Sequence, residues 1–103
     1  MISIKKQHKV KVFISGKVSG LDYYVAYGQF SNVEIKLQQM GYSAINPMCI
    51  CRKNWSWLRC MIVCLWHLSW CDIMVQLNNW QESKGARIEY KWAKLLGKTI
   101  LKE

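Results

Sequence analysis

The sequence has little proline and glycine, with one proline and six glycines among 103 residues. Collagen-like and low-complexity chains need far more of both, so these classes are excluded. Hydrophobic residues make up 51% of the chain, which is too large a share for a chain that is disordered throughout. A chain of this length has room for one domain with its own hydrophobic core.

A long hydrophobic run is also missing. The strongest apolar stretch, residues 60–71, is twelve residues long and contains His67, whereas a membrane-spanning helix needs roughly 20 mostly apolar residues. We therefore expect a buried or interface helix here and no membrane partner. No secretory signal is recognisable, which predicts a cytoplasmic protein with reduced thiols. The five cysteines are an odd number, which argues against a complete disulfide framework.

Acidic residues are scarce: six Asp and Glu stand against 15 Lys and Arg, giving a formal net charge of +9. Together with six tryptophans, this charge is compatible with a protein that stacks on single-stranded nucleic acid. The other interpretation is a solvated surface with dispersed lysines. Because the lysines are spread along the chain without a dense block, the second interpretation is favoured, and nucleic acid is not the expected partner.

Strand-like and helix-like spacing of apolar residues alternate along the chain. Strands are predicted at 10–15, 42–45, 72–77 and 99–101, and helices at 23–40, 56–69 and 85–96. Residues 48–55 are expected to be irregular, with Ser56 as the N-cap of the second helix. This βαβαβαβ order predicts a single α/β domain over residues 10–103, preceded by a short tail at 1–9. Such an order forms a parallel sheet with helices on both faces.

Ligands of parallel sheets bind beyond the carboxyl ends of the strands. Three predicted loops lie at that edge, at residues 16–22, 46–55 and 78–85. The first offers hydroxyls, a lysine and backbone amides near a helix N-terminus, a combination that suits an anion or a sugar hydroxyl. The residues concerned are Ser15, Gly16, Lys17 and Ser19. They match neither the dinucleotide fingerprint nor the P-loop, so a purely structural turn is an equal alternative.

The third loop places a hydroxyl, a glycine and a carboxylate at the start of a helix, in the segment Ser83 to Glu89. Glu89 is expected about one turn into this helix, where the helix dipole favours its ionised form. An ionised carboxylate at the mouth of a crevice can act as a nucleophile or stabilise an oxocarbenium-like centre. From spacing alone, a glutamate that merely complements the helix dipole is the favoured alternative.

Cysteine and tryptophan gather around the helix predicted at 56–69. Cys60, Cys64 and His67 share one helix face, and Cys49 and Cys51 precede them, so a Zn²⁺ site is conceivable. A second cysteine pair with knuckle spacing is missing, and free cysteine is commonly buried, so core packing is favoured and no metal is expected.

Two pairs of tryptophans receive different predictions. Trp66 and Trp70 are assigned to a subunit interface, because a helix that is apolar on every face must bury more than one side. Trp57 and Trp80 are candidates for stacking on a nucleobase. His8 and His67 receive no role.

Several segments together resemble the nucleoside 2-deoxyribosyltransferase-like superfamily, and more closely a small bacterial and phage family of uncharacterised domains within it. The segments are VFISGKVSG, INP, SW before an apolar helix, CDIMVQL, NW and SKGARIE, and the resemblance covers residues 10–100. It implies a flavodoxin-like (Rossmann-like) sheet of four to five strands and assembly as dimers or larger oligomers. It also implies cleavage or exchange of the N-glycosidic bond of 2′-deoxynucleosides or their 5′-phosphates, without a cofactor.

The resemblance also assigns roles to residues. Glu89 matches the nucleophilic glutamate, Ser83 matches a position that contacts the 5′-phosphate, and the loop at Gly16 matches the one that holds sugar and base. The expected substrate-binding set is Ser15, Gly16, Lys17, Ser19, Asn46, Trp80, Ser83 and Gly85. Cys64 stands where characterised enzymes tend to carry an aspartate that assists proton transfer. The alternative to an enzyme is therefore a catalytically impaired nucleotide-binding module. The expected partners are a nucleoside or nucleotide and a second copy bound through residues 56–69.

Overall fold

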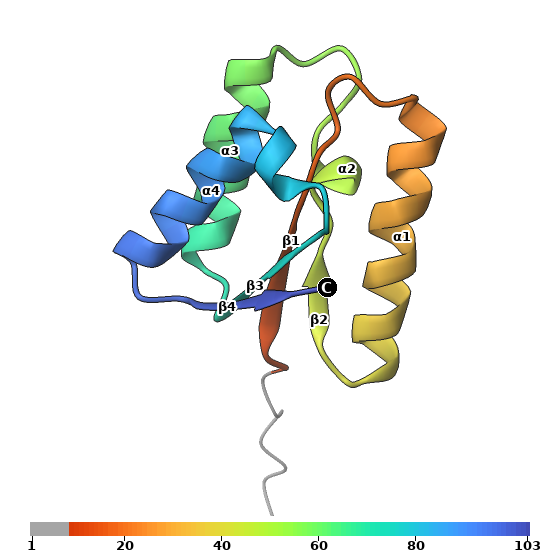
Figure 1. Cartoon of the computed structure of the whole chain (residues 1–103). Coiled ribbons are helices and arrows are strands. Elements are labelled where there is room, and N and C mark those ends of the chain that lie inside the picture. The colour runs from red at the N-terminus through yellow and green to blue at the C-terminus, as the bar shows by residue number, and fades with distance from the viewer. Residues whose placement is uncertain (1–8) are drawn as a thin grey trace, which may run out of the picture.

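The computed structural model describes residues 9–103, so most of the tail predicted at 1–9, including His8, lies outside the described residues. In the described part, four parallel strands form one sheet in the order β2-β1-β3-β4 (Figure 1). The strands are β1 (Lys11–Ser15), β2 (Ser43–Ile45), β3 (Ile73–Gln76) and β4 (Thr99–Lys102). The helices are α1 (Tyr23–Gln39), α2 (Pro47–Ile50), α3 (Trp57–Ser69) and α4 (Lys84–Leu95), with a 3₁₀ turn at Trp80–Glu82. The predicted parallel α/β architecture is confirmed.

Helices cover both faces of the sheet, with α1 on one side and α3 and α4 on the other (Figure 1). Successive side chains of a strand point to opposite faces, so β1 serves two cores. Val12 and Ile14 pack with α1 residues such as Phe30, whereas Phe13 packs with Leu68 of α3 and Ala93 of α4. Because both faces of β1 are buried, its sequence is a continuous apolar run and does not alternate between apolar and polar residues.

Polar side chains fix where the helices begin. Ser56 accepts a hydrogen bond from the backbone N–H of Arg59 at 3.1 Å, which confirms it as the N-cap of α3. The segment predicted to be irregular at 48–55 starts instead with the single-turn helix α2. Asn46 caps this turn by accepting from Met48 N–H at 3.0 Å, and Pro47 stands at its first position, where a missing N–H costs nothing. The Asn-Pro pair is thus a helix start.

Helix α3 leaves an apolar stripe uncovered. It buries Met61, Cys64 and Leu68, but Trp66 is 60% exposed and Trp70 66% exposed, and Leu58 and Ile62 continue the same side at four-residue spacing. The predicted use of this helix between subunits stays a prediction. Among the described residues, no helix is long and apolar enough to cross a membrane.

Candidate functional site

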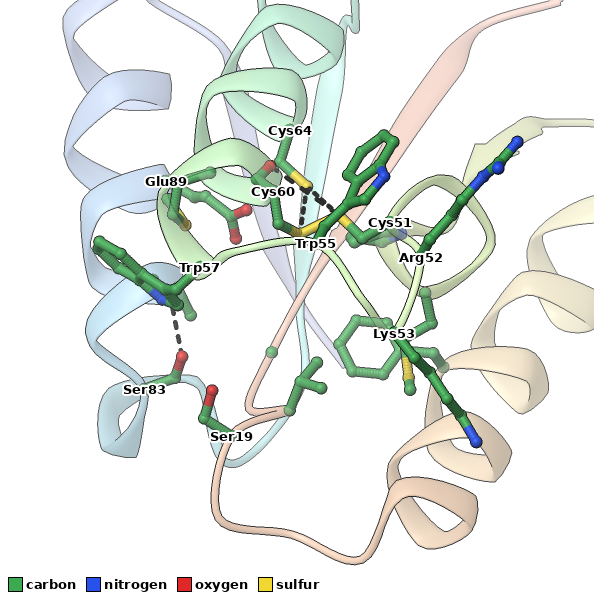
Figure 2. Close-up of a pocket in the computed structure, with 18 of the residues that line it drawn as sticks. Ser19, Cys51, Arg52, Lys53, Trp55, Trp57, Cys60, Cys64, Ser83 and Glu89 are labelled. Carbon is green, nitrogen blue, oxygen red and sulfur yellow. Dashed lines mark hydrogen bonds between the residues drawn. A yellow bond between two sulfur atoms is a disulfide. The ribbon is translucent and has the colours of Figure 1, made fainter.

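The sheet reverses its strand order between β1 and β3, which lie side by side although α1, β2, α2 and α3 separate them in sequence. Ser15 and Gln76, the last residues of these strands, are paired in register at this point. Ligands of open parallel sheets bind beyond the strands' carboxyl ends at such a switch point. A cavity of about 350 Å³ opens here (Figure 2), within the size range of small-molecule sites.

Loop segments and four helices build the walls of this cavity, and helices α1 and α2 contribute residues such as Phe30 and Met48. The loop after β1, the segment from α2 to α3, and the start of α4 each supply side chains, as does the cavity-facing side of α3. The lining residues used below are Gly16, Ser19, Cys51, Arg52, Lys53, Trp55, Trp57, Cys60, Cys64, Ser83, Gly85 and Glu89. The loop after β1 runs close to Leu77, the residue that follows β3, because a Cβ atom on Gly16 would lie 2.6 Å from Leu77 Cδ1. Only glycine fits that approach without a shift.

Glu89 is the only acidic residue that lines the cavity among the described residues. It is 6% exposed, and Ser15 Oγ donates a hydrogen bond to its Oε1 atom at 2.8 Å. Burial raises the pKa of Glu89 from 4.5 to about 8, while the hydrogen bond from Ser15 opposes that rise. A substantial share of this carboxyl therefore holds its proton at neutral pH.

This result corrects the expectation that the helix dipole keeps Glu89 ionised. Helix α4 begins at Lys84, so Glu89 is its sixth residue and lies beyond the first turn, which contains no acidic residue. The dipole's influence falls off within that first turn. Loss of solvation is the larger effect here, and it acts in the opposite direction.

The structure brings together five of the residues predicted for substrate binding. Gly16, Ser19, Ser83 and Gly85 line the cavity, and Ser15 reaches it through its hydrogen bond to Glu89. Ser83 also caps α4, since its Oγ accepts from Ala86 N–H at 3.2 Å. Gly85 lies against α3, where an added Cβ would meet Met61 Sδ at 3.0 Å.

Three residues of the predicted set lie outside the cavity lining. Lys17 points to Glu82, with 3.9 Å between its Nζ and the carboxylate Oε1. Asn46 is buried and caps α2. Trp80 packs on Tyr90 with 4.9 Å between ring centroids, so its face is taken by a neighbour in this structure.

Sequence reasoning placed loop 46–55 at the ligand edge and named Trp57 as a stacking candidate, but it assigned no role to Arg52, Lys53 or Trp55. Arg52, Lys53 and Trp55 line the cavity together with Trp57. Lys53 Nζ lies 3.9 Å from the centroid of the Tyr23 ring, so its charge is held against α1 at the cavity's rim. The signal was present, because this segment follows a strand's carboxyl end and carries two adjacent cations.

The cysteines on the cavity wall do not match the set predicted from helix spacing. Cys51 and Cys60 form a disulfide, a difference from the expected reduced thiols, and Cys64 Sγ lies 3.6 Å from Cys51 Sγ and 3.9 Å from Cys60 Sγ (Figure 2). His67 is not part of this group, and its ring packs against Trp66 at 5.1 Å. Burial, followed by the nearby Glu89 carboxyl, raises the pKa of Cys64 to about 12. Cys64 is therefore a weak acid and a weak thiolate source.

Two of the similar chains found among solved structures confirm the flavodoxin-like fold. One is a Clostridium botulinum CMP N-glycosidase, BcmB (TM-score 0.64, 20% identity, 89% of this chain and 66% of that one). The other is a Leishmania mexicana 2-desoxiribosyltransferase (TM-score 0.69, 18% identity, 90% of this chain and 63% of that one). The chain thus spans just under two thirds of each of these structures.

Among curated proteins, no relative matches the sequence significantly. A family model does match, over residues 10–102, and its description is "Domain of unknown function (DUF4406)". That match takes in all four strands, all four helices and every residue named above as lining the cavity. The chain therefore belongs to the DUF4406 family.

Proposed function

We propose that this protein cleaves or exchanges the N-glycosidic bond of a nucleoside or nucleotide, with the Glu89 carboxylate acting at the sugar. The observation that carries the proposal is the position of Glu89, a buried carboxyl in a cavity at the switch point of the sheet. The similar folds of an N-glycosidase and a deoxyribosyltransferase support the same kind of chemistry. Ser15 holds Oε1, which orients the carboxyl group.

The reaction needs Glu89 in its ionised form. As the bond between C1′ and the base nitrogen breaks, the base leaves with the bonding electrons and takes a proton from solvent. A carboxylate oxygen of Glu89 then bonds to C1′ and compensates its oxocarbenium-like charge. Water attacks C1′ next, loses a proton and releases the carboxylate; attack by a second base gives exchange instead. With a native pKa of about 8, the rate should rise with pH up to that region.

The remaining walls of the cavity suit the other parts of a nucleotide. Arg52 and Lys53 are exposed cations at its rim, and each can pair with a phosphate. Ser19 lines the cavity, and its hydroxyl can hydrogen-bond to sugar or phosphate oxygens. Trp55 and Trp57 bring aromatic rings to the cavity. Arg59 lies 4.3 Å from the Trp55 ring centroid and Lys84 5.1 Å from the Trp57 ring centroid, so a base would stack on the opposite face of either ring.

Release of free base from a panel of nucleosides tests the proposal. Deoxynucleosides, ribonucleosides and their 5′-monophosphates are incubated with the wild type, Glu89→Gln and the control Glu82→Gln, and free base is separated by chromatography. Glu82 is exposed and lies outside the cavity, so its variant should keep the wild-type rate. Glu89→Gln should release free base at least about 100-fold more slowly than the wild type. Release that is absent in the wild type, or that survives in Glu89→Gln, contradicts the proposal.

A nucleotide-binding module without turnover is the second candidate, and the Cys64 thiol is the observation that favours it. Glycosidic cleavage gains from a second acid that protonates the leaving base. The cavity offers a thiol with a pKa of about 12 in place of such an acid. A binding module predicts thermal stabilisation by a nucleotide of the same panel with no free base. A flat melting temperature across the panel speaks against it.

For the partner protein, we propose a second copy of this chain on the exposed side of α3. Large apolar side chains there would leave water on contact, and each is a candidate anchor. Sedimentation or size-exclusion chromatography should show an oligomer in the wild type that Trp66→Glu weakens. A wild type that is monomeric at high micromolar concentration refutes this assembly.

A further inference from the structure

The three cysteines on the cavity wall have an arrangement that the disulfide alone does not explain. A disulfide uses two sulfurs, yet three converge here, with all ligand atoms of Cys51, Cys60 and Cys64 within 4.8 Å of one another. Cys64 is buried beside the disulfide-bonded pair, forms no disulfide itself, and lies within S–H···S hydrogen-bond reach of both sulfurs. The spacing of Cys60 and Cys64, four residues apart on α3, puts both sulfurs on one side of that helix. The chain leaving α2 then returns Cys51 to the same side.

Two of the three sulfur–sulfur distances fit thiolate ligands of one ion. A tetrahedral zinc site with Zn–S bonds of about 2.3 Å holds its sulfurs about 3.8 Å apart. Cys64 Sγ lies 3.6 Å from Cys51 Sγ and 3.9 Å from Cys60 Sγ. The disulfide holds the sulfurs of Cys51 and Cys60 closer than two zinc ligands can lie, so after reduction these two half-buried side chains, whose Cα atoms are 5.5 Å apart, must rotate apart before both can bind one ion.

From this geometry we propose that the reduced Cys51, Cys60 and Cys64 bind one thiophilic metal ion, of which Zn²⁺ is the representative. Thiolates select zinc and similarly soft ions over Mg²⁺ or Ca²⁺. All three residues line the cavity, which provides the path by which an ion enters. Three protein ligands leave the fourth position to water on the cavity side. The ion would tie the end of α2 to α3 and so shape the wall that carries Arg52 and Trp55.

The disulfide is then the oxidised, metal-free form of the same cluster. A trialkylphosphine converts it to two thiols and becomes a phosphine oxide, with water supplying the oxygen atom and both protons. Zn²⁺ then displaces one proton from each thiol that it binds, and the buffer takes up these protons. Metal uptake can be measured without any glycosidic reaction, so the site is tested separately from the proposed catalysis, although Glu89 lines the same cavity.

Metal titration of the whole chain tests the proposal. Phosphine-reduced protein, freed of reductant without oxygen, is titrated with Zn²⁺ against a chromophoric chelator and with Co²⁺, whose thiolate complexes absorb in the near ultraviolet. We expect one ion per chain and a higher melting temperature with Zn²⁺. Protein with its disulfide intact should take up no stoichiometric ion.

The other cysteines provide matched controls. Cys49 is exposed and outside the cluster, and Cys71 is buried elsewhere, with its thiol donating to the His67 carbonyl. Cys49→Ser and Cys71→Ser should bind as the wild type does. Cys51→Ser and Cys60→Ser, at half-buried positions, should each weaken Zn²⁺ binding by at least about tenfold, as should Cys64→Ser, with circular dichroism confirming each fold. The proposal is overturned if reduced wild type takes up no ion, or if Cys51→Ser and Cys60→Ser bind with unchanged affinity.

Discussion

Replacing Glu89 with glutamine removes a buried ionisable group and preserves the shape of its side chain. The amide oxygen of glutamine can still accept the hydrogen bond from Ser15 Oγ. What changes is how the stability of the fold depends on pH. In the native state the pKa is about 8, against an ordinary value of 4.5. Between these values the native chain holds a proton that the unfolded chain has released, so the stability of the wild type falls as pH rises.

The size of the effect follows from the two pKa values. They differ by about 3.5, and each pKa unit corresponds to about 1.4 kcal/mol, so the full loss above pH 8 approaches about 5 kcal/mol. Between pH 5 and pH 8 the loss amounts to about 3 kcal/mol. Glu89→Gln lacks this dependence. It should match or fall below the wild type near pH 4.5 and gain on it by about 4 kcal/mol as pH rises to 8.

Urea unfolding followed by tryptophan fluorescence measures this difference at a series of pH values. The free energy of unfolding of Glu89→Gln minus that of the wild type is plotted against pH. Glu82→Gln is the control, because the Glu82 side chain is 67% exposed and its contact with Lys17 is long at 3.9 Å. A difference for Glu89→Gln that stays constant from pH 5 to pH 8 refutes the claim that burial raises the pKa of this carboxyl.

Further substitutions test single contacts. Ser15→Ala removes the donor that lowers the pKa of Glu89, so the rising limb of the pH–rate profile should move to higher pH; an unmoved limb contradicts this. Gly16→Ala forces a Cβ atom against the Leu77 side chain and should cost about 1–3 kcal/mol in urea unfolding. Gly28→Ala, whose Cβ would have nothing within 4 Å, should stabilise α1 by about 0.5–1 kcal/mol. Gln76→Leu should be neutral or stabilising in the same assay, because the buried amide has no hydrogen-bond partner within the described part of the chain, and a loss above about 2 kcal/mol would show that it has one.

Local sequence patterns predicted the elements of the fold well. Strand β1, helix α1 and the Ser56 cap of α3 depend on residues within one or two turns, so their signals are local. The order of strands and helices then implied a parallel sheet, and with it the edge at which loops gather. The prediction that residues 48–55 are irregular was only partly right. Asn46 and Pro47 start a helix of four residues, which is too short for propensity rules to detect.

The properties of the site depend on residues that are distant in sequence. Ser15 and Glu89 are 74 residues apart and meet only because β1 lies against β3 and α4 packs over both. The predicted ionisation of Glu89 considered its own helix and omitted the surroundings that exclude water. Trp80 carries the right chemistry for stacking, but the fold places its ring on Tyr90.

The sequence alone determined the alternation of strands and helices, the parallel sheet, and the loops that carry Gly16, Ser83 and Glu89 to one edge, because periodicity and capping act over a few residues. Tertiary structure decided the environment of each group. Burial sets the protonation of Glu89, and the return of the chain after α2 brings Cys51 to Cys60 and Cys64. Solvation and convergence depend on which distant surfaces meet, and no local pattern in the chain encodes them.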